Sequence, residues 1–231
     1  MNRLIEQTKK LKKKIVEISP KKKLIISVVA FLLIACGFVG NQLWQRKFDQ
    51  RVFDLQQEAL TEMAGKIPYQ RVTGNYTGED VEMLRLGNLS ADAGNLIQQY
   101  GVGIIRIPSI EMELPVLEGI TQANISIGAG TVKPNQRIGR GNFALLGHYM
   151  TNSGLLFGGL KNVQVGDEVY LTFYDKDAAY IVQEVKIVHQ SEGKYMLDNP
   201  EEPHYLTLIT CDGSRGGTDY RLIVRASLSE E

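Results

Sequence analysis

The sequence is poor in cysteine: only two occur in 231 residues, and histidine is almost as scarce, with three. Cys36 lies in an uncharged run near the N-terminus, so Cys211 is the only thiol in the remainder of the chain. A domain with one cysteine cannot form an internal disulfide. Cys211 is therefore an inert buried residue, an intermolecular link or a reactive group.

Net charge is also absent, because 26 Lys and Arg balance 26 Asp and Glu. The balance is uneven along the chain. Residues 1–23 carry nine basic residues against Glu6 and Glu17, a net charge of +7 that leaves −7 for the rest. The chain has no internal repeat or low-complexity tract, and its 43% hydrophobic and 23% charged residues are typical of a packed core. We expect one domain with accessory segments.

Charge is missing altogether from residues 24–45, LIISVVAFLLIACGFVGNQLWQ. As a helix this run would extend roughly 33 Å, enough to cross a hydrocarbon core of about 30 Å. Trp44 lies where an interfacial anchor is expected, and lysines crowd the N-terminal flank. These features predict a single-pass membrane anchor, with residues 1–23 as a cytoplasmic basic tail beside membrane lipid and the domain outside.

Two alternatives remain open for this segment. A cleaved signal peptide is disfavoured by the long charged region and the lack of a small-residue cleavage site. Leu33-Ile34-Ala35-Cys36 matches the lipobox at which bacterial lipoproteins are cleaved and acylated. Apolar residues continue beyond Cys36, which favours an uncleaved helix in which this cysteine is a small apolar residue. A lipid anchor and a spanning helix would both tether the domain to the outer face.

Residues 46–84 are expected to form a helical stalk and linker. Between Phe48 and Met63, apolar residues recur every three or four positions among polar ones, which predicts an amphipathic helix. We interpret it as a juxtamembrane stalk that lifts the domain off the bilayer. Residues 67–87 combine glycine, threonine, asparagine and charge without periodicity, which indicates a linker or the domain edge.

From residue 85 onward, short strand-forming segments alternate with turn residues. The predicted strands cover residues 102–107, 110–117, 142–147, 168–173, 179–188, 205–210 and 221–226. Short helical turns are expected near residues 121–125, 155–160 and 194–198. Strands at this spacing favour a β-barrel or sandwich, so the predicted fold class is mainly β.

Cys211 ends the strand-forming run from Tyr205, and a glycine-rich loop follows it. His148 likewise ends an apolar strand where a loop begins. His189 instead precedes an ordinary polar turn, and His204 lies among acidic residues, so His148 is the best candidate partner for the thiol. Both positions predict side chains on the rim of the sheet rather than in its core.

Arg221 opens the last predicted strand, nine residues after Cys211. A hairpin would bring it back beside the thiol. Arg215 lies in a glycine-rich loop that would hold a side chain poorly, and Arg225 lies further along the same strand face. A nearby cation lowers the pKa of a thiol, an imidazole can protonate a leaving amine, and a guanidinium can stabilise an oxyanion. A solvent-exposed arginine and a satisfied polar histidine are the alternatives without function.

Three stretches of sequence resemble known motifs. Thr207-Leu208-Ile209-Thr210-Cys211 reproduces the TLxTC signature of sortases, and Leu146-Gly147-His148 resembles their (A/S)GH segment, with Leu146 larger than the usual residue. Arg221 resembles the arginine that opens their last strand. The chain thus resembles a class A (housekeeping) sortase over roughly residues 85–228. The N-terminal anchor, the lack of a hydrophobic tail and the lack of a lid-like insertion favour class A over the pilin-polymerising class C.

The resemblance implies a sortase-type eight-stranded β-barrel with short helices in residues 85–231. It also implies a cysteine transpeptidase in which Cys211 attacks the Thr–Gly bond of LPxTG-type sorting signals. His148 would protonate the departing amine, and Arg221 would hold the oxyanion. Thr210, Ile209 and Leu146 would line the groove for the Leu-Pro part. An amine of the peptidoglycan precursor lipid II would resolve the thioacyl enzyme. The expected partners are therefore LPxTG-bearing surface proteins and this amine, with no nucleic acid.

No cofactor is expected. Some class A sortases are activated by calcium, and four glutamates lie in suitable regions: Glu111, Glu113, Glu118 and Glu192. Calcium requires six to eight oxygen ligands, whereas alternating Glu111 and Glu113 are typical of the solvated face of a strand.

Other classes fit less well. An L,D-transpeptidase requires Ser/Thr-x-Gly-Cys-x-Arg around its cysteine, and a papain-like or NlpC-type hydrolase has its cysteine before its histidine. An inert, membrane-tethered binding barrel is the alternative without catalysis, and in it replacing Cys211 would have no effect.

Overall fold

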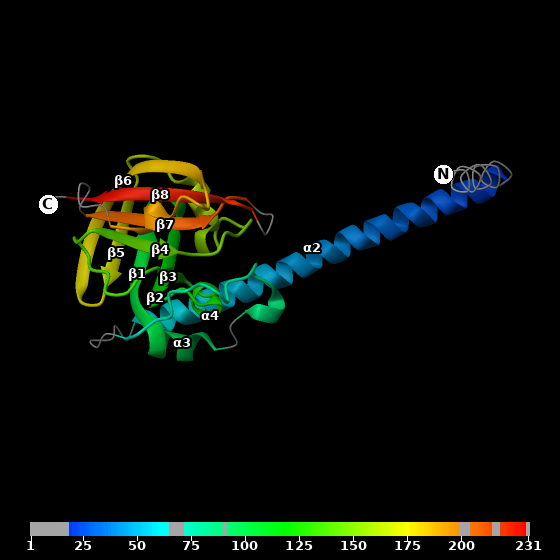
Figure 1. Ribbon diagram of the computed structural model, residues 1–231. Coiled ribbons are helices and arrows are strands. Elements are labelled where there is room, and N and C mark those ends of the chain that lie inside the picture. The colour runs from blue at the N-terminus through cyan, green and yellow to red at the C-terminus, as the bar shows by residue number, and fades with distance from the viewer. Residues whose placement is uncertain (1–18, 65–71, 90–91, 199–203, 214–217, 230–231) are drawn as a thin grey trace. The chain divides into compact units, whose positions relative to one another are not determined.

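The computed structural model describes residues 19–64, 72–89, 92–198, 204–213 and 218–229 (Figure 1). The chain divides after Lys47 into two compact units, Met1–Lys47 and Phe48–Glu231. Helix α2 (Pro20–Ala64) contributes residues to both units. Most of the predicted cytoplasmic tail, residues 1–18, lies outside the described residues.

The first unit contains the apolar part of α2. An 18-residue window of this helix has a mean hydropathy of 2.5, and none of that window is buried. Large apolar side chains from Leu24 to Trp44 are exposed. In the described part of the chain, α2 is the one helix long and apolar enough to cross a membrane. This property fits the expected single-pass anchor.

Eight strands of the described chain close into a barrel, in the order β1-β2-β3-β4-β7-β8-β6-β5 (Figure 1). The mainly β, eight-stranded fold expected from the sequence is therefore confirmed. Their bounds are β1 Gly101–Ile107, β2 Met112–Leu117, β3 Ala129–Thr131, β4 Asn142–Leu146, β5 Glu168–Phe173, β6 Lys176–His189, β7 Tyr205–Cys211 and β8 Tyr220–Leu228.

Alternation along the strands separates the barrel core from its outer surface. On β7, Leu206 and Leu208 belong to the main core cluster, whereas Ile209 packs in a separate cluster with Ile223 of β8. Strand β7 pairs in parallel with β4 and antiparallel with β8. It therefore lies between the two strands that carry the other candidate residues.

Short helices connect the strands: η1 Leu86–Asn88, α3 Ala93–Tyr100, η2 Pro108–Ile110, α4 Gln122–Ile125, η3 Leu156–Asn162 and η4 Gly193–Met196. The expected turns near residues 121–125, 155–160 and 194–198 correspond to α4, η3 and η4. Sequence patterns missed α3 and the three-residue strand β3. Helix α3 begins with a side-chain cap, in which the amide of Asn95 donates to the Asp92 carboxylate over 2.8 Å.

The C-terminal part of α2, which falls in the segment expected to form the stalk, packs on the domain. Phe48 and Val52 join the main core cluster, while Leu55, Ala59 and Met63 pack with residues of α3, β1 and β2. The periodic apolar residues are buried because the helix covers part of the domain. Residues 48–64 thus belong to the same compact unit as the barrel.

The segment predicted as a linker is also attached, from residue 72 onward. The amide of Ile120 donates to the carbonyl of Asn75 over 2.8 Å, and the amide of Glu82 donates to Gln122 Oε1 over 2.8 Å. Residues 65–71 lie outside the described residues. Of the two interpretations given for residues 67–87, a linker or the domain edge, these contacts favour the domain edge for the described residues from 72 onward.

Candidate active site

Cys211 is the last residue of β7 and is half-buried, with a free thiol. Its direct partner in the antiparallel ladder is Arg221, the second residue of β8. The next pair is hydrogen-bonded, because the amide of Asp212 donates to the carbonyl of Tyr220 over 3.0 Å. Cys211 and Arg221 therefore form a non-hydrogen-bonded pair, the kind in which facing side chains are closest.

His148 reaches the same level from the other side of β7. Leu146 of β4 is aligned with Ile209, and the amide of Gly147 extends this ladder by donating to the carbonyl of Ile209 over 3.1 Å. Two residues further along parallel strands, His148 lies at the level of Cys211. The backbones of His148, Cys211 and Arg221 thus meet at one end of three neighbouring strands.

Two hydrogen bonds to backbone carbonyls hold the segment that carries His148. Thr210 Oγ1 donates to the carbonyl of Gly147 over 2.8 Å, and the amide of Phe157 donates to the carbonyl of His148 over 3.1 Å. The Phe157 ring packs so closely that a Cβ on Gly147 would lie 2.7 Å from its Cδ2 atom. A glycine before the histidine is therefore required by packing.

The imidazole of His148 is 8% exposed, and burial lowers its pKa to about 4. Its Nε2 atom is buried and has no hydrogen-bond partner among the described residues. A neutral imidazole with a free ring nitrogen can accept and return a proton at neutral pH. His148 follows the end of β4, as expected, but its side chain is buried rather than exposed on the rim.

Arg221 is held by Thr218 and Tyr220, at the start of β8, and by Gln190, which directly follows β6. Its Nη1 donates to the carbonyls of Thr218 at 2.7 Å and Tyr220 at 3.0 Å, and its Nη2 donates to Gln190 Oε1 at 2.9 Å. Gln190 in turn donates to the Asp219 carboxylate over 2.9 Å. Gln190 had no recognisable sequence signal, because its partner lies 31 residues away.

The two rival arginines do not share this position. Arg225 is aligned with Thr207, four residue pairs from the Cys211 level on the same strand face, and its guanidinium lies 4.2 Å from the centre of the Tyr205 ring. Arg215 lies outside the described residues. Arg221 is therefore the described arginine that the strand register pairs with Cys211.

Leu146 and Ile209 lie on the outer face of the barrel in one apolar cluster with Val188, Tyr195 and Ile223. Ile209 of this cluster lies two residues before Cys211 on β7 and therefore on the same face of the strand. Thr210 has the opposite orientation from Ile209. It is 1% exposed and alternates onto the inner face, where its hydroxyl bonds to Gly147.

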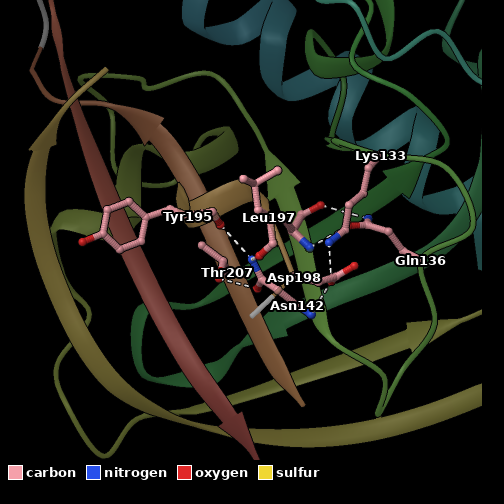
Figure 2. Close-up of polar contacts among 8 residues, drawn as sticks. Lys133, Gln136, Asn142, Tyr195, Leu197, Asp198 and Thr207 are labelled. Carbon is pink, nitrogen blue, oxygen red and sulfur yellow. Dashed lines mark hydrogen bonds and ion pairs between the residues drawn. The ribbon is translucent and has the colours of Figure 1, made fainter. Parts of the chain in front are cut away.

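A polar network holds Tyr195 and its helix η4 against β4 (Figure 2). The side chain of Asn142 donates to the carbonyls of Tyr195 over 2.8 Å and Leu197 over 3.2 Å, and it accepts from Thr207 Oγ1 over 2.6 Å. The Asp198 carboxylate accepts from the backbone amide of Asn142 over 2.9 Å and forms an ion pair with Lys133. These contacts fix one wall of the apolar cluster.

The remaining histidines have other surroundings. His189 is exposed, with Nδ1 2.8 Å from Ser191 Oγ and its ring against Tyr220 at 5.7 Å. His204 is exposed at the start of β7 and adopts a positive φ of 75°. Neither lies at the level of Cys211 in the β4–β7 ladder.

Three of the four glutamates considered for calcium each contact different partners. Glu113 pairs with Arg106 at 2.7 Å, and Glu192 pairs with Lys194 at 3.4 Å. Glu118 is buried and accepts from Tyr76 over 2.6 Å and Thr131 over 3.0 Å. Among the described residues, no group of three or more His, Cys, Asp or Glu side chains is arranged to hold a metal ion.

Comparison with known proteins agrees with this geometry. A Sortase domain matches residues 105–229, and on this basis the chain belongs to the sortase family. It is 31% identical to a sortase A of Bacillus anthracis over 194 residues, covering 82% of this chain and 88% of the relative. It is 30% identical to a sortase A of Listeria monocytogenes over 189 residues, covering 82% of each.

Solved structures support the same assignment. A crystal structure of Listeria monocytogenes sortase A superimposes with a TM-score of 0.54 at 34% identity, covering 57% of this chain and 88% of the other. The resemblance to class A sortases is thereby confirmed, and the chain is a sortase transpeptidase. The L,D-transpeptidase, papain-like and inert binding-barrel alternatives are set aside.

Proposed function

We propose that the chain cleaves the Thr–Gly bond of LPxTG-type sorting signals and transfers the new acyl group to an amine of a peptidoglycan precursor. Cys211 is the nucleophile, His148 the general acid and base, and Arg221 the oxyanion donor. The observation that carries the proposal is the strand register, which brings these three residues to one end of β4, β7 and β8. The apolar cluster that contains Leu146 and Ile209 supports these two residues as the binding site for the Leu-Pro part of the signal.

In the first half of the reaction, the Cys211 thiol passes its proton to the neutral imidazole, and the sulfur attacks the carbonyl carbon of threonine. The pKa of His148, about 4, supports a resting state in which the imidazole is neutral and can accept this proton. Arg221 stabilises the negative oxygen while the C–N bond breaks, and His148 protonates the departing glycine amine.

In the second half, the acceptor amine attacks the thioester. His148 takes a proton from this amine, the C–S bond breaks, and the Cys211 thiolate regains a proton. The product is an amide, so no net redox change or water consumption occurs. We further propose that the enzyme requires no metal, and that α2 anchors it in the cell membrane with the N-terminus cytoplasmic and the barrel extracellular, where surface proteins and lipid II are accessible.

The test uses the full-length chain in detergent with an LPETG peptide and triglycine or an alanine amine as acceptor. Mass spectrometry should detect the new amide, and its formation should be unchanged by EDTA. Replacing Cys211 by alanine should abolish it, and His148→Ala and Arg221→Ala should each lower it by at least 100-fold. Cys36→Ala is the matched control and should retain wild-type activity, because Cys36 lies in the apolar helix.

Hydrolysis that added amine never diverts would contradict the transpeptidase proposal. Full activity of the Cys211→Ala variant would contradict the proposed nucleophile. A peptide with Leu-Pro replaced by Ala-Ala tests the recognition element, and it should be cleaved much more slowly than LPETG.

A further inference from the structure

The C-terminal part of α2 contacts the segment that follows His148. Gln56 is 5% exposed, although its neighbours on the polar side of the helix are in solvent. Its Oε1 accepts from the amide of Leu156 over 3.1 Å, and its Nε2 donates to the carbonyl of Glu113 over 3.4 Å. One buried side chain therefore joins the helix to β2 and to the start of η3, residues 57 and 100 positions away in sequence.

The contact continues from Leu156 to the candidate histidine. Leu156 adopts a positive φ of 44°, which is unusual for a residue other than glycine and requires support from its surroundings. The next residue, Phe157, donates its amide to the carbonyl of His148 and packs against Gly147. The hydrogen bond from Gln56 thus supports the strained Leu156, and the next residue, Phe157, holds the backbone of His148.

Other residues on the same helix face contact this segment. Asp49, Val52 and Gln56 are spaced by three and four positions, so they lie on one side of α2. Asn152 Nδ2 lies 3.5 Å from the Asp49 carboxylate, and Val52 belongs to the large core cluster that also includes Met150 and Leu155. The helix is therefore hydrogen-bonded to this segment at two points, through Asp49 to Asn152 and through Gln56 to Leu156.

We propose that Gln56 is a positioning residue for His148, and that the juxtamembrane helix is part of the catalytic apparatus rather than a spacer. This inference rests on the proposed role of His148. Gln56 touches neither substrate nor thiol; it acts through Leu156 and Phe157 on the backbone of the histidine. A displacement of about 1 Å at a catalytic group is enough to lower a rate by up to 100-fold.

Gln56→Met tests the proposal in the full-length chain, because methionine has a similar length but forms neither hydrogen bond. We expect kcat for amide formation to fall about tenfold while KM for the LPETG peptide changes less than twofold. Gln57→Met is the matched control, since Gln57 is exposed on the same helix, and it should leave both constants unchanged. Equal kinetics of the two variants would overturn the proposal.

A histidine titration provides a readout that does not need turnover. NMR of histidine-labelled chain should show His148 titrating near pH 4 in the wild type, and nearer to 6.5 in Gln56→Met as water reaches the loosened segment. If the wild-type chain forms no amide, the proposed function fails. The positioning role of Gln56 is tested separately, and it fails if the titration of His148 is the same in Gln56→Met as in wild type.

A second variant covers the case in which Gln56→Met does not fold. Gln56→Glu retains an oxygen that accepts from the amide of Leu156 but loses the donor to Glu113. Because only the first bond reaches the histidine segment, kcat should remain within about threefold of wild type. A tenfold loss in folded Gln56→Glu would show that the bond to Leu156 is not the one that matters, and would contradict the inference.

Discussion

Cys211 and Arg221 face each other as a directly aligned pair at the ends of β7 and β8. The pair is possible because the connection between the two strands brings the last strand back antiparallel along the one before it. The guanidinium of Arg221 is held by two backbone carbonyls and by Gln190, so its direction is set by residues outside the sequence signature.

Gln190→Ala should lower kcat/KM for amide formation about fivefold, because the guanidinium loses the partner of its Nη2 atom and spends less time in the position that the oxyanion needs. The measurement is a steady-state assay with LPETG peptide. Gln183→Ala is the control, since Gln183 is exposed on β6 and bonds to Ser227 and a backbone carbonyl instead. Identical kinetics for both variants would show that Gln190 does not position Arg221.

Stability should depend on pH through His148. Its pKa is about 4 in the folded chain and near 6.5 when unfolded, so the unfolded state binds the proton more tightly. The contribution of His148 to the free energy of unfolding is therefore fully present above about pH 7 and is lost as the pH falls from 6.5 to 4. At about 1.4 kcal/mol per pKa unit, the loss attributable to this residue is roughly 3 kcal/mol.

Urea denaturation at several pH values between 4 and 8 measures this effect. His148→Asn removes the titrating group, so its free energy of unfolding should change less over this range than that of wild type. If the two proteins lose stability in parallel as the pH falls, the burial of His148 is not the cause.

Gly147→Ala should destabilise the domain by about 1–3 kcal/mol, because the added methyl group would overlap the Phe157 ring. Movement of that ring should also displace His148 and lower kcat. Thermal unfolding and the amide assay measure the two effects. Gly154→Ala is the comparison, since a Cβ there meets Asn152 at an ordinary 3.5 Å. Equal melting temperatures for the two variants would contradict the packing argument.

Asn142→Ala should cost about 2–4 kcal/mol, since it leaves the buried hydroxyl of Thr207 and two backbone carbonyls without their partner. Release of η4 should also move Tyr195 away from Leu146 and Ile209 and raise KM for the peptide. Denaturation and peptide kinetics provide the measurements. An unchanged KM in the folded variant would indicate that η4 does not shape the peptide site.

Much of the barrel could be predicted because strand-forming runs and turn residues are local properties. Seven of the eight strands were predicted near their observed places, while β3 was missed because three residues are too short to show a pattern. Helix α3 was missed because its eight residues carry only two apolar positions that become buried, Ala93 and Ile97.

The site was predictable only in part for a similar reason. Cys211, His148 and Arg221 could be selected because each occurs at a strand end and matches a motif. The inward orientation of Thr210 was not predictable, because its neighbours alone do not say which side of the strand faces the core. Gln190 and Gln56 had no signal, since each acts through a partner distant in sequence.

The amino-acid sequence by itself determined the apolar anchor, the mainly β fold and the identity of the three chemical groups, because hydropathy, strand periodicity and motif spacing are contained in short stretches. Only the tertiary structure decided that the juxtamembrane helix packs on the domain, that His148 is buried with a lowered pKa, and that two glutamines support the site. These properties depend on which surfaces meet after folding, since burial and hydrogen bonding belong to pairs of segments rather than to either one alone.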